Sequence, residues 1–134
     1  MTAPGTRTTE SLFAGRPASL LLFKVVRRFI GSLGPVEVEA AKTQVSFKNA
    51  RKFAWVWLPL RSTTTRPDNC IVLTFALDRR VIHDRIAESV EPYPGRFTHH
   101  VIIERESDLN DDVRGWLSEA YAFGQTRRAR RRKS

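Results

Sequence analysis

Residues 53–58 read Phe-Ala-Trp-Val-Trp-Leu, and this run decides the fold. Side chains alternate between the two faces of a strand, so the three aromatic residues share one face and the three aliphatic residues share the other. A strand that is apolar on both faces belongs in the middle of a sheet. Residues 44–48, Gln-Val-Ser-Phe-Lys, also alternate and are joined to this run by the polar link at 49–51. We therefore expect a β-hairpin whose second strand is central.

Further strands are expected on both sides of this hairpin. Residues 36–40 alternate between apolar and acidic side chains, whereas 70–77 are apolar on both faces. Residues 96–104 form the last expected strand, which follows a rigid turn at 91–95. Asp78 is expected to begin a short helical or turn segment that runs to about Ala87. Five strands in close succession predict a mostly antiparallel sheet.

Two helices are expected to cover this sheet. Pro17 suits the first turn of a helix, apolar residues recur at three- and four-residue spacing up to Leu33, and Gly34-Pro35 ends the pattern. A second apolar stripe runs from Leu109 to Tyr121, with Ser107 as the expected N-cap. The fold class predicted is α+β, a mostly antiparallel five-stranded sheet packed by an N-terminal and a C-terminal helix.

The chain has 134 residues, enough for one core, and its net charge is +9. We expect a flexible leader at 1–9, a single α+β domain at 10–125 and a basic disordered tail at 126–134. Subtracting the six tail charges from +9 leaves +3 for the rest of the chain. Runs of like charge repel one another and commonly bind polyanions such as nucleic acid. The tail residues predicted to contact nucleic acid are Arg127, Arg128, Arg130, Arg131, Arg132 and Lys133.

Several classes of protein are excluded by what the sequence lacks. The apolar run at 20–23 is broken by Lys24, so no segment is expected to span a membrane. The polar residues 1–9 do not resemble a secretory signal, and a cytoplasmic protein is therefore expected. Cys70, the one cysteine, begins the apolar strand expected at 70–77 and is interpreted as a small core residue.

No motif of a known catalytic class is complete. The sequence contains no Gly-x-Ser-x-Gly turn and no phosphate-binding glycine pattern. Asp68 resembles the start of a nuclease core, but the only lysine that follows it is Lys133 in the tail. We therefore expect no cofactor.

Two pairs of residues have both a structural and a functional interpretation. His99 and His100 point to opposite faces of a strand, so they cannot jointly bind one metal ion, and no metal site is predicted. Each is a structural histidine, a ligand-binding residue or a proton-transfer residue. Trp55 and Trp57 either pack in the core or stack bases on a sheet surface. The basic residues that would accompany such stacking are Lys42, Lys48 and Arg51.

Several blocks of the chain, taken in order, resemble a bacterial family known as domain of unknown function 5655. The blocks are Gly34-Pro35-Val36, residues 42–47, residues 53–57, residues 95–100 and residues 111–117. The resemblance covers roughly Leu12 to Phe123 and leaves the basic tail outside. The family has no established biochemical activity, so the resemblance implies no reaction. It implies that a shared ligand pocket would involve Lys42, Arg96, His99 and His100.

Two functional hypotheses follow. The first is a small cytoplasmic binding or accessory module whose basic tail has nonspecific affinity for nucleic acid or another polyanion. The rival is an enzyme of unrecognised type that uses His99 or His100 as a general base, with Lys42 or Arg96 binding an anionic substrate. A homodimeric structural protein is a third possibility, and the sequence does not specify an oligomeric state.

Overall fold

The structure, a computed structural model, describes residues 12–13, 16–41, 43–58 and 70–125. The leader at 1–9, Lys42 and the tail at 126–134 therefore lie outside the described residues. The helices are α2 (Pro17–Leu33) and α3 (Asp111–Gln125), with a short 3₁₀ turn η1 (Glu106–Asp108). The strands are β1 (Glu37–Ala40), β2 (Gln44–Lys48), β3 (Lys52–Trp57), β4 (Ile71–Leu77), β5 (Ile86–Tyr93) and β6 (Arg96–Ile103).

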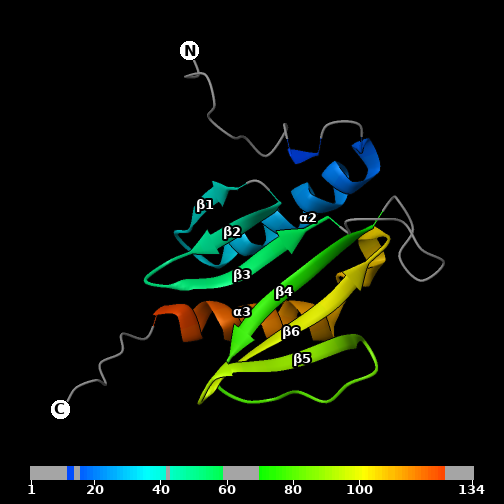
Figure 1. The fold of residues 1–134 in the computed structure, drawn as a ribbon. Helices are drawn as coiled ribbons and strands as arrows, with labels where there is room; N and C mark the ends of the chain where they lie inside the picture. The colour runs from blue at the N-terminus through cyan, green and yellow to red at the C-terminus, as the bar shows by residue number, and fades with distance from the viewer. Residues whose placement is uncertain (1–11, 14–15, 42, 59–69, 126–134) are drawn as a thin grey trace.

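The strands form one sheet in the order β1-β2-β3-β4-β6-β5, and each neighbouring pair is antiparallel. Both α2 and α3 lie behind this sheet in the view of Figure 1. The α+β class, the antiparallel sheet and the central place of β3 are confirmed. None of the described helices is long and apolar enough to cross a membrane.

The predicted count of five strands is wrong, because the sheet has six. The missed strand is β5, which covers the end of the segment expected to be helix or turn and part of the expected turn at 91–95. β5 lies at the edge of the sheet, paired with β6 alone. An edge strand needs ladder bonds on one side only, so it accommodates Pro92 and its acidic residues without losing its pairing.

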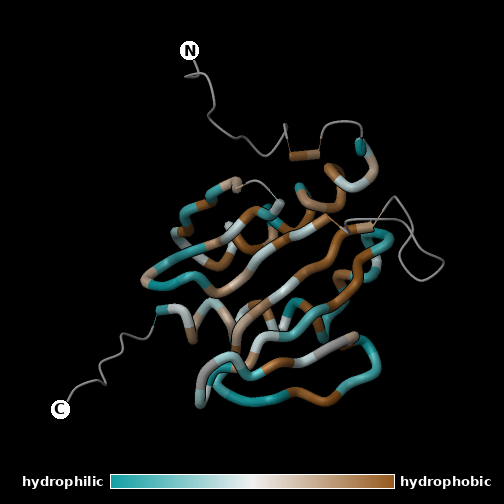
Figure 2. The backbone as a smooth tube through the Cα atoms, viewed as in Figure 1, coloured by the Kyte–Doolittle hydropathy of each residue, from teal (hydrophilic) through white to brown (hydrophobic). Residues whose placement is uncertain are grey.

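The core lies between the sheet and the two helices. Phe47, Ala54, Phe75 and His99 are cross-strand partners on β2, β3, β4 and β6, and all four are buried. The Phe23 ring on α2 lies 6.0 Å from Phe47, and the Trp116 ring on α3 lies 5.8 Å from Phe75. All seven residues of β4 are buried, and most of this strand is hydrophobic in Figure 2.

The start of α3 differs from the prediction. The Asn110 Oδ1 atom accepts a hydrogen bond of 3.1 Å from the Val113 backbone N–H, which is the geometry of an N-cap. Ser107 lies instead in the 3₁₀ turn η1, so its predicted capping role is wrong. The apolar stripe of α3 is confirmed, because Val113, Trp116 and Tyr121 are all buried.

The opposite face of the sheet carries a second row of cross-strand partners, Ser46, Trp55, Thr74 and His100. No helix in the described part of the chain covers this side of the sheet (Figure 1). We call it the helix-free face. Trp55 and His100 are half-buried there, whereas Ser46 and Thr74 are buried beside them.

Candidate functional site

The turn between β2 and β3 contacts the last turn of α3. The Asn49 side-chain amide donates to the Tyr121 carbonyl at 2.8 Å, and the Arg51 backbone N–H donates to the Gly124 carbonyl at 3.0 Å. The Arg51 guanidinium adds a bond of 3.0 Å to the Phe123 carbonyl. The last carbonyls of a helix have no partner within the helix, so residues from a distant turn stabilise this end of α3.

Four cations gather where α3 ends. They are Lys48, which lines a pocket with Gln125; Arg51 and Arg96, which contact Phe123; and Lys52, whose carbonyl accepts a bond from Arg96. We call this set the basic end. The Arg96 Nη2 atom donates to the Lys52 carbonyl at 3.0 Å, and this bond joins the start of β6 to the start of β3. Lys48 and Lys52 are exposed, and the two arginines are half-buried. The β2–β3 turn is accordingly hydrophilic in Figure 2.

The arginines of the basic end lie over aromatic rings. The Arg51 guanidinium carbon is 4.6 Å from the centroid of the Phe123 ring. The Arg96 guanidinium carbon is 5.8 Å from the Trp55 ring and 6.0 Å from the Phe123 ring. Because a cation over a ring face is attracted by the ring quadrupole, these contacts hold both guanidinium groups near the end of α3.

Negative charge is concentrated at the other end of α3. The acidic residues there are Glu104, Glu106, Asp108, Asp111 and Asp112. This distribution complements the dipole of α3, whose N-terminus is positive and whose C-terminus is negative. At the basic end Glu39 lies 3.7 Å from Lys52, but both side chains are exposed and water screens the pair. At the acidic end, Arg85 pairs with Asp108 at 3.4 Å and Arg114 with Asp111 at 2.6 Å, so the negative charge there is partly neutralised.

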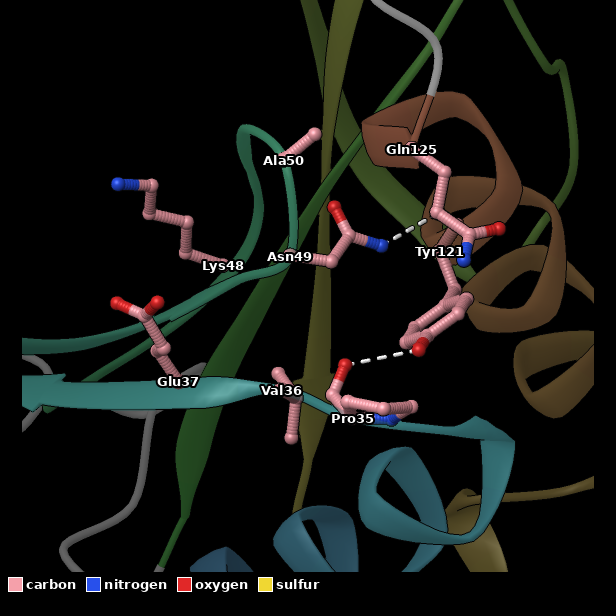
Figure 3. A pocket seen from close by; sticks show the side chains of 8 residues that line it. All are labelled: Pro35, Val36, Glu37, Lys48, Asn49, Ala50, Tyr121 and Gln125. Atoms are coloured by element: carbon pink, nitrogen blue, oxygen red, sulfur yellow. Dashed lines mark hydrogen bonds between the residues drawn. The ribbon is translucent and has the colours of Figure 1, made fainter.

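A shallow pocket of about 450 Å³ opens beside the basic end. Figure 3 shows the Tyr121 hydroxyl donating to the Pro35 carbonyl, at 2.8 Å, and the Asn49 amide bonded to the Tyr121 carbonyl. The side chains of Glu37 and Lys48 extend outward from it (Figure 3). The pocket is lined by Pro35, Val36, Glu37, Lys48, Asn49, Ala50, Tyr121 and Gln125.

His99, one of the predicted ligand-binding residues, lies in the core. It is 0% exposed, and its ring stacks on Phe75 with centroids 5.2 Å apart. Its Nε2 atom accepts a hydrogen bond of 3.0 Å from the Val81 backbone N–H, so the neutral ring carries its hydrogen on Nδ1. Burial lowers the pKa of His99, although the Phe75 backbone acts in the opposite direction. This geometry fits a neutral structural histidine.

His100 lies on the helix-free face, where its Nδ1 atom is 2.7 Å from the Thr74 hydroxyl. Arg96 is on the same face of β6 but four residues away, a distance of roughly 13 Å along a strand. The structure thus brings Arg96 and His100 to one face and separates His99 from both. Of the remaining candidates, Lys42 and the six tail residues lie outside the described residues.

Other sequence interpretations can also be located. Cys70 is fully buried, as expected of a small core residue. Within the described residues, no group of three His, Cys, Asp or Glu side chains is placed to hold a metal ion. Lys52 and Phe123 were not among the predicted site residues. Lys52 lies directly after Arg51, so the clustering of basic residues in one turn is the signal that could have found it.

The geometry defines an α+β domain with two helices on one face of an antiparallel sheet and a cluster of cations at the end of the second helix. The chain belongs to the family described as domain of unknown function (DUF5655), whose model matches residues 9–124. No curated protein and no solved structure matches the chain.

Proposed function

We propose that this domain is a small cytoplasmic binding or accessory module that binds nucleic acid nonspecifically through the basic end and the tail that follows it. One observation carries the proposal. α3 ends at Gln125, in the last turn that Arg51 and the β2–β3 turn contact, so the tail begins beside the cations of the body. Because the sequence runs from Gln125 directly into the basic residues at 127–133, we expect the basic end and the tail to bind one polyanion together.

The affinity of such a region is electrostatic. Each phosphate that a lysine or arginine neutralises releases condensed counterions, and the observed association constant falls linearly with salt on a logarithmic scale. The six tail charges account for most of the net charge of +9, so the tail supplies most of this salt dependence. The four cations of the basic end, held by the folded body, supply the remainder.

The proposal is tested by removing residues 126–134 and measuring binding to labelled duplex DNA and duplex RNA between 50 and 200 mM salt. At about 0.9 per neutralised phosphate, loss of six charges reduces the slope of log association constant against log salt by up to about 5. The truncated chain should keep its thermal midpoint, because the described domain ends at Gln125. Equal affinity and equal slope for the two chains would contradict the proposal.

The structure leaves one of the two histidines as a candidate for the general base of the enzyme hypothesis. His99 is buried and bonded to Val81, so a general base on β6 would have to be His100. The Thr74 hydroxyl orients the His100 ring through its Nδ1 atom. The pocket near Tyr121 is lined by residues other than His100, so it does not support a general base on β6.

A further inference from the structure

The helix-free face carries Trp55 directly beside the basic end, and we propose that this tryptophan stacks with a base of a single-stranded nucleic acid. This inference rests on the proposed function and adds the class of ligand. The arginines of the tail contact phosphates, which single strands and duplexes both carry. A preference for one of the two forms must therefore come from the folded body.

The residues paired directly with Trp55 on the neighbouring strands are small. Its cross-strand partners are Ser46 on β2 and Thr74 on β4, both short and both buried. Trp55 itself is half-buried. Trp57, two residues further along β3, lies between Gln44 and Val72. Trp57 thus shares the strand and the face of Trp55 but lies further from the basic end.

Arg96 reaches across the sheet to Trp55 from β6. Its guanidinium carbon lies 5.8 Å from the indole centroid, and its Nη2 atom bonds the Lys52 carbonyl. Aromatic rings and guanidinium planes are the two kinds of surface on which proteins stack unpaired bases. Arg96 and the exposed Lys52 also provide positive charge for the phosphates that flank a stacked base. The aromatic ring for stacking and the cations for the phosphates therefore lie side by side at the basic end.

A single strand is favoured over a duplex because only an unpaired strand exposes the faces of its bases. In a duplex each base is stacked between its neighbours, and only the base edges are accessible in the grooves. A tryptophan on a sheet surface contacts a base face, which is accessible only in an unpaired strand. The positive charge of the basic end and tail complements the phosphates of such a strand. DNA and RNA single strands share this chemistry.

The experiment measures binding of the full chain to labelled oligo-dT, oligo-rU and a duplex of equal length. Trp55→Ala should weaken both single-stranded complexes about tenfold and the duplex complex less than twofold, while the salt slope stays unchanged because tryptophan is uncharged. The matched control Trp57→Ala should change all three affinities less than twofold. Trp55→Phe keeps a stacking ring and should restore most of the affinity.

Tryptophan fluorescence gives a second readout on well-folded variants. Addition of oligo-dT should quench the emission of the wild-type chain and of Trp57→Phe, but not that of Trp55→Phe. If the full chain binds neither single strand nor duplex, the proposed function itself fails. If single strand and duplex bind equally, or if Trp55→Phe retains the quenching, the stacking inference is overturned and the proposed function stands. Equal losses in Trp55→Ala and Trp57→Ala overturn the assignment to Trp55.

Discussion

At the scale of single residues, His99 is a titratable ring held neutral in an apolar core. Burial lowers the pKa of His99 in the folded protein, whereas the unfolded chain titrates near the ordinary value of about 6.5. Below that pH the unfolded state binds a proton that the folded state does not. The contribution of His99 to stability is therefore complete above about pH 6.5 and decreases as the pH falls towards the folded-state pKa.

We expect the free energy of unfolding to decrease between pH 6.5 and pH 5 with a slope of up to about 1.4 kcal/mol per pH unit from this residue. Urea unfolding at a series of pH values measures it. His99→Gln keeps an oxygen acceptor for the Val81 N–H but does not titrate, so its slope should be smaller. His83→Gln is the control for the slope, because His83 lies outside the core and His99 remains; its absolute stability is not compared, since His83 also contacts Asp112 and Trp116. An equal slope in wild type and His99→Gln would contradict the expectation.

Alternation along β6 was enough to predict that His99 and His100 point to opposite faces. It could not say which histidine enters the core, because Val101, Ile102 and Ile103 make the strand apolar on both sides. His99 is the histidine in the core because it pairs with Phe75 on β4. The Phe75 ring in turn packs against Trp116 of α3. The contact between Arg96 and Trp55 also depends on strand order, which local periodicity does not contain.

At the scale of elements, the end of α3 depends on the β2–β3 turn. Asn49→Asp keeps the size of the side chain but replaces the amide that donates to the Tyr121 carbonyl with a carboxylate. A negative charge near the C-terminus of a helix also opposes the helix dipole. We expect Asn49→Asp to destabilise the protein by about 2 kcal/mol and Asn49→Ala by about 1 kcal/mol. Thermal unfolding measures both, and the reverse order would contradict the role of charge.

Two helical glycines offer a matched comparison. A Cβ atom added at Gly31, on α2, would meet nothing within 4 Å, so Gly31→Ala should stabilise the protein by about 0.5–1 kcal/mol through helix propensity. A Cβ atom at Gly124, on α3, would lie 2.5 Å from Asn49 Oδ1 and 3.0 Å from Phe53 Cβ. We expect Gly124→Ala to destabilise the protein by about 1–3 kcal/mol despite the same gain in propensity.

Chemical denaturation of the two glycine variants measures this difference. Stabilisation by both substitutions would show that the contact between α3 and the β2–β3 turn is looser than the structure indicates. The need for glycine at position 124 was not predictable, because Phe53 is 71 residues away in the chain. The edge strand β5 escaped prediction for a related reason, since its sequence is compatible with strand only when β6 supplies the pairing.

At the scale of the whole molecule, the two ends of the body differ in charge. Lys52 and Arg105 are both exposed, but Lys52 belongs to the basic end and Arg105 lies among the acidic residues near the start of α3. Lys52→Gln and Arg105→Gln each remove one positive charge. We expect Lys52→Gln to weaken duplex binding a few-fold and to lower the salt slope by up to about 0.9, whereas Arg105→Gln leaves both nearly unchanged.

Salt titrations of the two complexes measure this effect, with thermal unfolding as a check on folding. Equal losses for the two variants would show that net charge alone governs binding and would contradict a localised site. Composition was enough to predict that most of the charge of +9 lies in the tail. It could not predict that Arg96 would bond to the start of β3, because these segments meet only through the folded sheet.

The burial of β4 on both faces also has a consequence for how the chain is made. β4 presents seven consecutive buried residues, and the helix that covers Phe75 begins only at Asp111. Synthesis proceeds from the N-terminus at about 5–20 residues per second. The apolar side of β4 therefore stays uncovered for about 2–7 s while residues 78–111 are added. We expect this uncovered apolar surface to make the nascent chain prone to aggregation until α3 docks.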